Sequence, residues 1–143
     1  MRKSKTLARI RNGEPVRICS LGHVIPAYIK YAAHHGFDCI WLDLEHRAMD
    51  QREVQALMAF FHKYDIDCML RAPTLEKAKL YRYLEDGASG LMIPHVSTPE
   101  KAKALVDACK FPPLGDRGLD GAGMDNDFMF FDEDYPARTN AET

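Results

Sequence analysis

The sequence predicts an α/β fold in which four βα units form one parallel sheet. Two observations predict it. Short apolar runs of strand type alternate with longer segments of helical period, as expected for buried parallel strands joined by helices. No G-x-G-x-x-G or G-x-x-x-x-G-K-[ST] sequence follows any of these runs, which disfavours a nucleotide-binding sheet. The pattern alone leaves a doubly wound sheet and a (β/α)₈ barrel open, and a complete barrel needs roughly 250 residues.

The first two units occupy the N-terminal part of the chain. Val16–Ser20 is expected to be a strand, and Ile25–His35 a helix that Gly36 closes at its C-cap. Cys39–Leu44 is the second expected strand. Asp50 is a good N-cap for a helix to Tyr64, which carries apolar residues at helical spacing.

The next two units follow the same plan. Asp67–Leu70 and Gly90–Ile93 are expected to be strands, and Thr74 begins a segment of helical period that ends near Gly87. The last helix is expected to start at Ser97 or Thr98 and to run to Cys109, with a proline in its first turn.

The C-terminal part is different in character. Residues 111–127 are rich in glycine, proline and aspartate, which predicts a long loop that is functional or mobile. A short helix is expected at Asp127–Phe131, and Thr139–Thr143 carry no structural signal. The 143 residues are expected to form one domain.

Composition narrows the possible partners. The formal net charge is −2 and no apolar run is long enough for a membrane span, so neither nucleic acid nor a membrane is implied. The basic N-terminus has no apolar signal-peptide core after it, which favours a cytoplasmic protein. The four cysteines lack zinc-site spacing and are expected to be reduced core thiols: Cys19, Cys39, Cys68 and Cys109.

Polar residues follow the expected strands, at the edge where parallel α/β folds place their chemistry. His46 follows Asp43 and Glu45 and is a candidate general base, since a neighbouring carboxylate can orient the ring. A solvated loop histidine is the alternative. Arg71 offers a fixed fork for a carboxylate or a developing enolate, although a salt bridge to Glu45 or Asp43 would explain it equally simply.

Other candidates are less specific. Arg117 stands in a glycine-flanked turn, where a clamp on a substrate and a contact with a neighbouring subunit are equally compatible with the spacing. Packing roles are expected for His23 and His95. Glu85 and Asp86 end a helix, where carboxylates oppose the dipole, and a hydrogen bond to a catalytic histidine would account for them. Surface positions are expected for His34, His35 and His62.

Six motifs follow one another along the chain: Gly36-Phe37-Asp38, Leu42-Asp43-Leu44-Glu45-His46, Leu70-Arg71-Ala72-Pro73, Leu84-Glu85-Asp86-Gly87-Ala88, Gly90-Leu91-Met92-Ile93-Pro94 and Phe111-Pro112-Pro113-Leu114-Gly115-Asp116-Arg117-Gly118. This ordered set closely resembles the HpcH/HpaI aldolase family, whose members include 2-keto-3-deoxy sugar acid aldolases and 4-hydroxy-2-oxo-heptanedioate aldolase. The resemblance starts near residue 5 and continues to the end of the chain.

The resemblance implies a (β/α)₈ TIM barrel, of which this chain would form about the first four βα units. It implies a divalent metal, Mg²⁺, Mn²⁺ or Co²⁺, that polarises a keto acid. His46 takes the place of the family's catalytic histidine and Arg71 that of its pyruvate-binding arginine. Glu85 stands where the family has an aspartate that raises the basicity of the histidine. The family's two metal-ligating carboxylates are expected beyond Thr143, so no metal ligand is assigned in this chain.

The expected activity is metal-dependent aldol cleavage of a 2-keto-3-deoxy (4-hydroxy-2-oxo) acid to pyruvate and an aldehyde. A homo-oligomer is expected, and the 143-residue chain alone is expected to be inactive. One alternative is a related lyase barrel that forms an enolate from an acyl-CoA or phosphoenolpyruvate. The other is a non-catalytic half barrel that serves as an assembly module and exposes the edges of its first and fourth strands.

Overall fold

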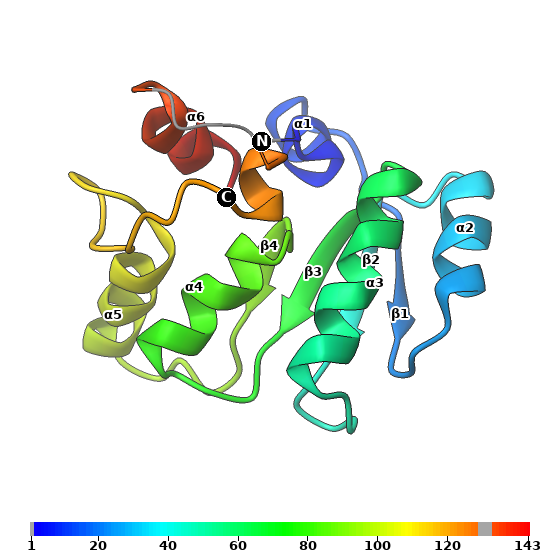
Figure 1. Ribbon diagram of the computed structural model, residues 1–143, viewed down its shortest axis with the longest axis horizontal. Coiled ribbons are helices and arrows are strands. Elements are labelled where there is room, and N and C mark those ends of the chain that lie inside the picture. Colours follow the sequence, from blue (N-terminus) through cyan, green and yellow to red (C-terminus); the bar gives the residue numbers. More distant parts are fainter. Residues whose placement is uncertain (1, 129–132) are drawn as a thin grey trace.

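The computed structural model describes residues 2–128 and 133–143 of the chain (Figure 1). Four parallel strands form one sheet in the order β1-β2-β3-β4, and a helix follows each strand. The predicted α/β class and the four βα units are confirmed. The strands are β1 (Ile18–Leu21), β2 (Cys39–Asp43), β3 (Asp67–Arg71) and β4 (Gly90–Met92), and the helices that follow them are α2 (Pro26–His34), α3 (Gln51–Lys63), α4 (Lys77–Glu85) and α5 (Pro99–Cys109).

The register of the sheet brings the carboxyl ends of neighbouring strands together. Asp43 at the end of β2 is paired with Arg71 at the end of β3, and Arg71 with Met92 at the end of β4. The strand arrows in Figure 1 point the same way, so the loops that leave them meet at one edge of the sheet. β1 begins at Ile18, two residues after the predicted start at Val16.

The core lies between the sheet and the helices. Ile40 and Leu42 of β2 and Leu70 of β3 are fully buried on this side. They belong to one cluster with the apolar face of α3. The helix begins with a capping box in which Asp50 and Glu53 bind each other's backbone N–H. Each fully buried side chain of this size contributes about 1.5–3 kcal/mol.

Two further helices were not predicted. Helix α1 (Lys5–Arg11) has Ser4 as its N-cap and crosses the amino end of the sheet. The buried Asp67 carboxylate holds it there, since it accepts hydrogen bonds from the Ser4 hydroxyl at 2.7 Å and the Thr6 backbone at 2.8 Å.

Helix α6 (Tyr135–Glu142) includes most of the last residues, Thr139–Thr143, which carry no structural signal in the sequence. Pro136 in the first turn was an available start signal. Tyr135 and Thr139 are buried, and the Glu142 carboxylate accepts a hydrogen bond from the Ser4 backbone at 3.0 Å. Tertiary contacts therefore stabilise a helix too short to form alone.

The segment between α5 and α6 contains a 3₁₀ turn, η1 (Met124–Asn126). The short helix expected at Asp127–Phe131 lies mostly outside the described residues. Its first two residues, Asp127 and Phe128, have φ angles of 56° and 54°, so they do not start a helix.

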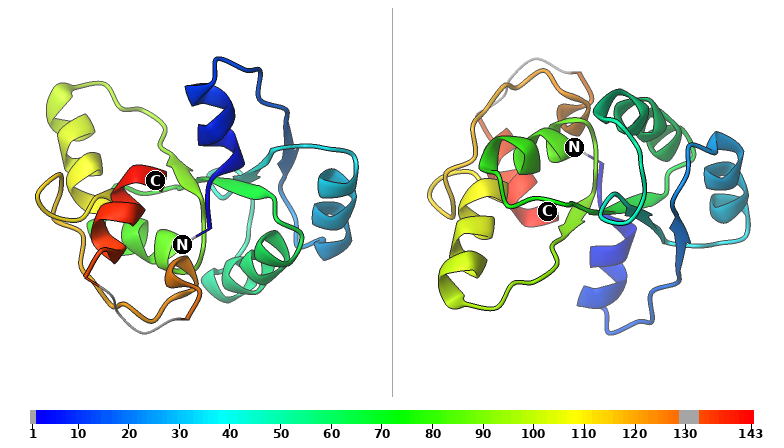
Figure 2. Two further views of the ribbon diagram at one scale, coloured as in Figure 1. Left: turned by 90° about the horizontal axis from the view of Figure 1, so that it is seen from above. Right: turned by 90° about the horizontal axis from the view of Figure 1, so that it is seen from below.

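The sheet and its helices form an open arc (Figure 2). Helices α3 and α4 lie on one side of the sheet and α1 on the other, near the amino ends of the strands. Side chains that alternate with the buried core positions face the inside of the arc, where Ile18 is 48% and Met92 39% exposed. Within the described residues, no helix is long and apolar enough to span a bilayer.

Candidate active site

Asp43 and Arg71 form a two-point ion pair at the carboxyl ends of β2 and β3. The Arg71 Nε donates to one Asp43 oxygen at 3.0 Å and its Nη2 to the other at 2.7 Å. The guanidinium also lies over the Trp41 ring, 4.7 Å from its centre. Mainly through the hydrogen bond from Arg71, the pKa of Asp43 is lowered to about 2. Asp43 thus fixes the orientation of a permanent cation.

Glu45 connects this pair to two histidines. Its Oε2 lies 3.2 Å from the Arg71 Nη1 and 3.5 Å from the His46 Nε2. Its Oε1 lies 3.7 Å from the His95 Nε2. These five residues, Asp43, Glu45, His46, Arg71 and His95, are called the Glu45 cluster below. His46 and Arg71 therefore meet at one carboxylate, as their positions after consecutive strands predicted.

The Glu45 cluster combines an exposed imidazole with a largely buried guanidinium. The His46 side chain is 63% exposed, whereas that of Arg71 is 18% exposed. The salt bridges to Asp43 and Glu45 considered as the alternative for Arg71 are both present. These salt bridges use only some of the N–H groups of Arg71. The remaining N–H groups can donate to an anionic oxygen of a substrate.

Glu85 is not brought to His46. Helix α4 runs back from the carboxyl end of β3 to the amino end of β4, and Glu85 is its last residue. The carboxylate is buried there and lies 3.6 Å from the Arg82 guanidinium. Burial raises the pKa of Glu85, while Arg82 and Arg117 oppose this shift. The expected contact that would adjust the basicity of His46 is therefore absent between these two described residues.

Arg117 also lies away from the Glu45 cluster. Its side chain is fully buried, donates to Asp125 at 2.6 Å and covers the Phe111 ring at 4.6 Å. Asp125 also accepts a hydrogen bond from the Tyr135 hydroxyl. Asp125 thus links Arg117, within the 111–127 segment, to α6. Such burial contradicts both expected uses of this side chain, as a substrate clamp and as a contact with another subunit.

The remaining histidines and the cysteines are distributed as follows. The packing roles expected for His23 and His95 are wrong, since both are exposed. His62 is half-buried rather than on the surface, and burial lowers its pKa while its Nε2 lies 3.2 Å from the Gly87 carbonyl. The surface positions of His34 and His35 and the unpaired state of all four cysteines are as predicted.

The described residues do not by themselves fit a metal ion. Within residues 2–128 and 133–143, no group of three or more His, Cys, Asp or Glu side chains is placed to hold one. The carboxylates of the Glu45 cluster, Asp43 and Glu45, both face Arg71, so a cation already neutralises them. Any metal at this edge would require ligands other than these residues.

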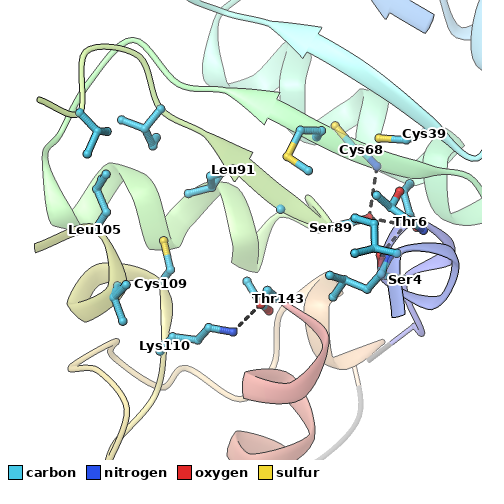
Figure 3. Close-up of a pocket in the computed structure, with 18 residues that line it drawn as sticks. Ser4, Thr6, Cys39, Cys68, Ser89, Leu91, Leu105, Cys109, Lys110 and Thr143 are labelled. Carbon is cyan, nitrogen blue, oxygen red and sulfur yellow. Dashed lines mark hydrogen bonds between the residues drawn. The ribbon is translucent and has the colours of Figure 1, made fainter. Parts of the chain in front are cut away.

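The structure also contains an apolar cavity away from the Glu45 cluster. It measures about 390 Å³ and follows the open edge of β4 (Figure 3). Leu91 of β4 and Leu105 and Cys109 of α5 line this cavity, and so do Ser4 and Thr6 at the start of α1. Neither His46 nor Arg71 borders it, so cavity size alone does not locate the chemistry.

Sequence reasoning missed three residues at the carboxyl edge. Trp41 supports Arg71 from inside the arc. Thr74 and Lys101 border a cavity beside Glu45. Thr74 stands only three positions after Arg71, so its position just after β3 could have identified it as a residue of this edge. Lys101 lies in the first turn of α5, where charge pattern alone gave no reason to single it out.

Residues 21–143 match the model of the family described as HpcH/HpaI aldolase/citrate lyase. A 4-hydroxy-2-oxovalerate aldolase of Rhodococcus jostii is 39% identical over 65% of this chain and 36% of its own length. A hydroxypyruvate/pyruvate aldolase of Deinococcus radiodurans is 32% identical over 93% of this chain and 48% of its own. This chain thus spans about half, or less, of the length of these relatives.

The crystal structure of an HpcH/HpaI aldolase from Desulfitobacterium hafniense superposes with a TM-score of 0.89 at 29% identity. The match covers 95% of this chain and 53% of that one. The open arc of four βα units therefore corresponds to about half of a barrel of the TIM type.

Proposed function

The chain belongs to the HpcH/HpaI aldolase/citrate lyase family, and we propose that it carries catalytic residues of a pyruvate aldolase. The reaction would cleave a 4-hydroxy-2-oxo acid, such as a 2-keto-3-deoxy sugar acid, into pyruvate and an aldehyde. The names of the relatives from Rhodococcus jostii and Deinococcus radiodurans support this class of substrate.

One observation carries the proposal. An exposed imidazole and an oriented guanidinium meet at the Glu45 carboxylate, at the edge where parallel α/β folds bind their substrates. Aldol cleavage needs a base for a hydroxyl proton and a positive charge for the enolate oxygen that develops. His46 and Arg71 supply these two groups from adjacent strands.

In the proposed mechanism, His46 accepts the proton of the substrate's 4-hydroxyl. The electron pair of the broken O–H bond forms the second bond of the aldehyde carbonyl as the C3–C4 bond breaks. The electrons of the C3–C4 bond move into the enolate of pyruvate, whose oxygen Arg71 stabilises. His46 then delivers its proton to C3, which gives pyruvate, and the reverse sequence adds the enolate to an aldehyde. Preorganised charge of this kind is commonly the largest catalytic contribution.

Metal dependence is part of the proposal. A divalent ion such as Mg²⁺, Mn²⁺ or Co²⁺ would bind the keto acid and polarise its carbonyl. Because the described residues do not form such a site, we expect the isolated 143-residue chain to show no metal-dependent turnover. Chelator-sensitive cleavage by that chain alone would contradict this expectation.

The test is aldol cleavage by the protein as its gene encodes it, with the released pyruvate measured by coupled reduction. His46→Asn is expected to lower kcat by roughly 100- to 10,000-fold, the usual contribution of a general base. His23→Asn is the control, because His23 is exposed and lies outside the Glu45 cluster. Unchanged cleavage by His46→Asn would remove the assigned base, and cleavage of an acyl-CoA in place of the keto acid would favour the related lyase.

A further inference from the structure

A second cavity opens directly beside the Glu45 cluster. It measures about 200 Å³ and lies among the loops that leave β2, β3 and β4 and the first turn of α5. Glu45, Thr74, Ile93, His95 and Lys101 are among the residues that line it. Its volume is below the roughly 300–1,000 Å³ of pockets for drug-sized ligands, so it suits a molecule of a few heavy atoms.

Glu45 separates this cavity from the position of Arg71. One carboxylate oxygen faces Arg71 and His46, and the other faces His95, which borders the cavity. A molecule in the cavity would therefore lie one side chain away from the groups assigned to the chemistry. An aldol reaction needs a place for the second carbonyl compound next to the enolate, and this cavity lies next to the groups assigned to the enolate.

Lys101 gives this cavity a positive charge without a matching carboxylate. Its Nζ lies 3.3 Å from the Ser97 hydroxyl and 3.4 Å from the His95 carbonyl, both neutral oxygens. Within the described part of the chain, no carboxylate lies within 4.0 Å of this Nζ. Lys103, two positions further along α5, pairs with Asp107 at 2.7 Å. The difference singles out Lys101 as a cation that remains available to an anionic ligand.

The backbone at His95 adds a second sign of a specialised loop. His95 has a φ of 58°, a left-handed conformation that is costly for a residue with a side chain. The Lys101 ammonium donates to the carbonyl of this same residue. The turn thereby holds an 87% exposed imidazole near Glu45, at the mouth of the cavity.

We infer that this cavity binds the aldehyde partner of the reaction and that Lys101 favours aldehydes with a terminal carboxylate. The inference rests on the proposed aldolase function and adds the residue that sets substrate preference. Lys101 would contact the carboxylate of the aldehyde, whereas Arg71 serves the pyruvate enolate. His95 would add a second donor at the same end when it is protonated.

The test compares two pairs of aldehydes in condensation with pyruvate: glyoxylate with acetaldehyde, and succinic semialdehyde with butanal. The members of a pair differ mainly in the carboxylate. The effect is measured on the anionic aldehyde for which the unmutated protein has the higher kcat/KM. In the protein as its gene encodes it, Lys101→Met is expected to lower that kcat/KM about 10- to 100-fold, as when a hydrogen bond to a charged group is lost. The value for its neutral partner should stay within about threefold, and Lys101→Arg should restore part of the preference.

Lys103→Met is the matched control, since it removes a lysine of the same helix that is already paired. An equal loss for both members of a pair, or no loss for either, would overturn the inference while leaving the aldolase function intact. A purely structural role for Lys101 at the His95 turn predicts that equal loss. Failure of the unmutated protein to condense any of these aldehydes with pyruvate would instead reject the proposed function and the subsite with it.

A binding measurement on the 143-residue chain does not depend on turnover. Succinate is the probe, and ¹⁵N chemical shifts are followed in the chain and in its Lys101→Met variant. We expect saturable shifts around Thr74, His95 and Lys101 that weaken at least tenfold in the variant. Equal affinity in the two proteins would contradict a carboxylate site at Lys101.

Discussion

At the scale of single residues, Asp43 and Glu45 have the most specific roles. The sequence predicted that His46 and Arg71 would lie together, because both follow parallel strands. A salt bridge from Arg71 to Asp43 or Glu45 was one of the two interpretations of Arg71, but the sequence did not show that Asp43 would bind it at two points while the two oxygens of Glu45 face different neighbours. How Asp43 and Glu45 contact their neighbours depends on side-chain rotamers that packing in the sheet sets. The spacing of the strands in the sequence does not specify these rotamers.

The ion pair predicts a change in acid stability. The pKa of Asp43 in the folded chain is about 2, below its ordinary value of 3.8, so its contribution to stability is present above pH 4 and is lost as the pH falls from about 4 to about 2. Arg71→Met should raise the pKa of Asp43, remove that dependence and lower the free energy of unfolding at neutral pH.

Urea unfolding at several pH values, together with NMR titration of the Asp43 carboxyl, measures both effects. Arg52→Met, at an exposed position of α3, is the control and should leave the titration unchanged. An Asp43 pKa that stays near 2 without Arg71 would show that the guanidinium is not its main cause.

At the scale of elements, the βα units were predictable and the terminal helices were not. The four units have strong apolar periodicity and clear caps, as Asp50 shows for α3. Helices α1 and α6 are short and depend on distant partners such as Asp67 and Tyr135. Local sequence carries little information about contacts between segments far apart in the chain.

The contact between the 111–127 segment and α6 predicts a large effect of Asp125. Asp125→Ala would leave the buried Arg117 cation without its carboxylate and remove the acceptor of the Tyr135 hydroxyl. The free energy of unfolding is expected to fall by about 3–5 kcal/mol. Chemical denaturation measures it.

Asp116→Ala is the matched control, because it removes a carboxylate of the same segment that is 81% exposed and pairs with Lys77 on the surface. Its effect should stay below about 1 kcal/mol. Similar losses for the two variants would mean that the Arg117–Asp125 pair does not stabilise the segment.

At the scale of the whole molecule, the half-barrel shape was predicted from the family resemblance, because the βα pattern alone also allowed a doubly wound sheet. The apolar residues expected on the sheet divide by position. Ile40, Leu42 and Leu70 are fully buried against the helices, while Ile18 and Met92 remain exposed inside the arc. The inner face of the arc therefore retains exposed apolar surface.

That inner face predicts self-association of the 143-residue chain. Exposed apolar side chains beside the open edges of β1 and β4 favour contact between copies. Sedimentation velocity should show concentration-dependent oligomers, and the double variant Ile18→Ser, Met92→Ser should shift the distribution toward monomer. Leu114→Ser, which removes an exposed leucine of the 111–127 segment, is the control. A chain that is monomeric at all concentrations would contradict the expectation.

The central claim is that the Glu45 cluster forms and stabilises the enolate of pyruvate. The most direct measurement is exchange of the pyruvate methyl protons for deuterium, followed by ¹H NMR in D₂O with the protein as its gene encodes it. We predict catalysed exchange that falls by roughly 100-fold or more in Arg71→Met, the size expected when a preorganised charge is removed. Exchange that proceeds at the unmutated rate in Arg71→Met would contradict the account.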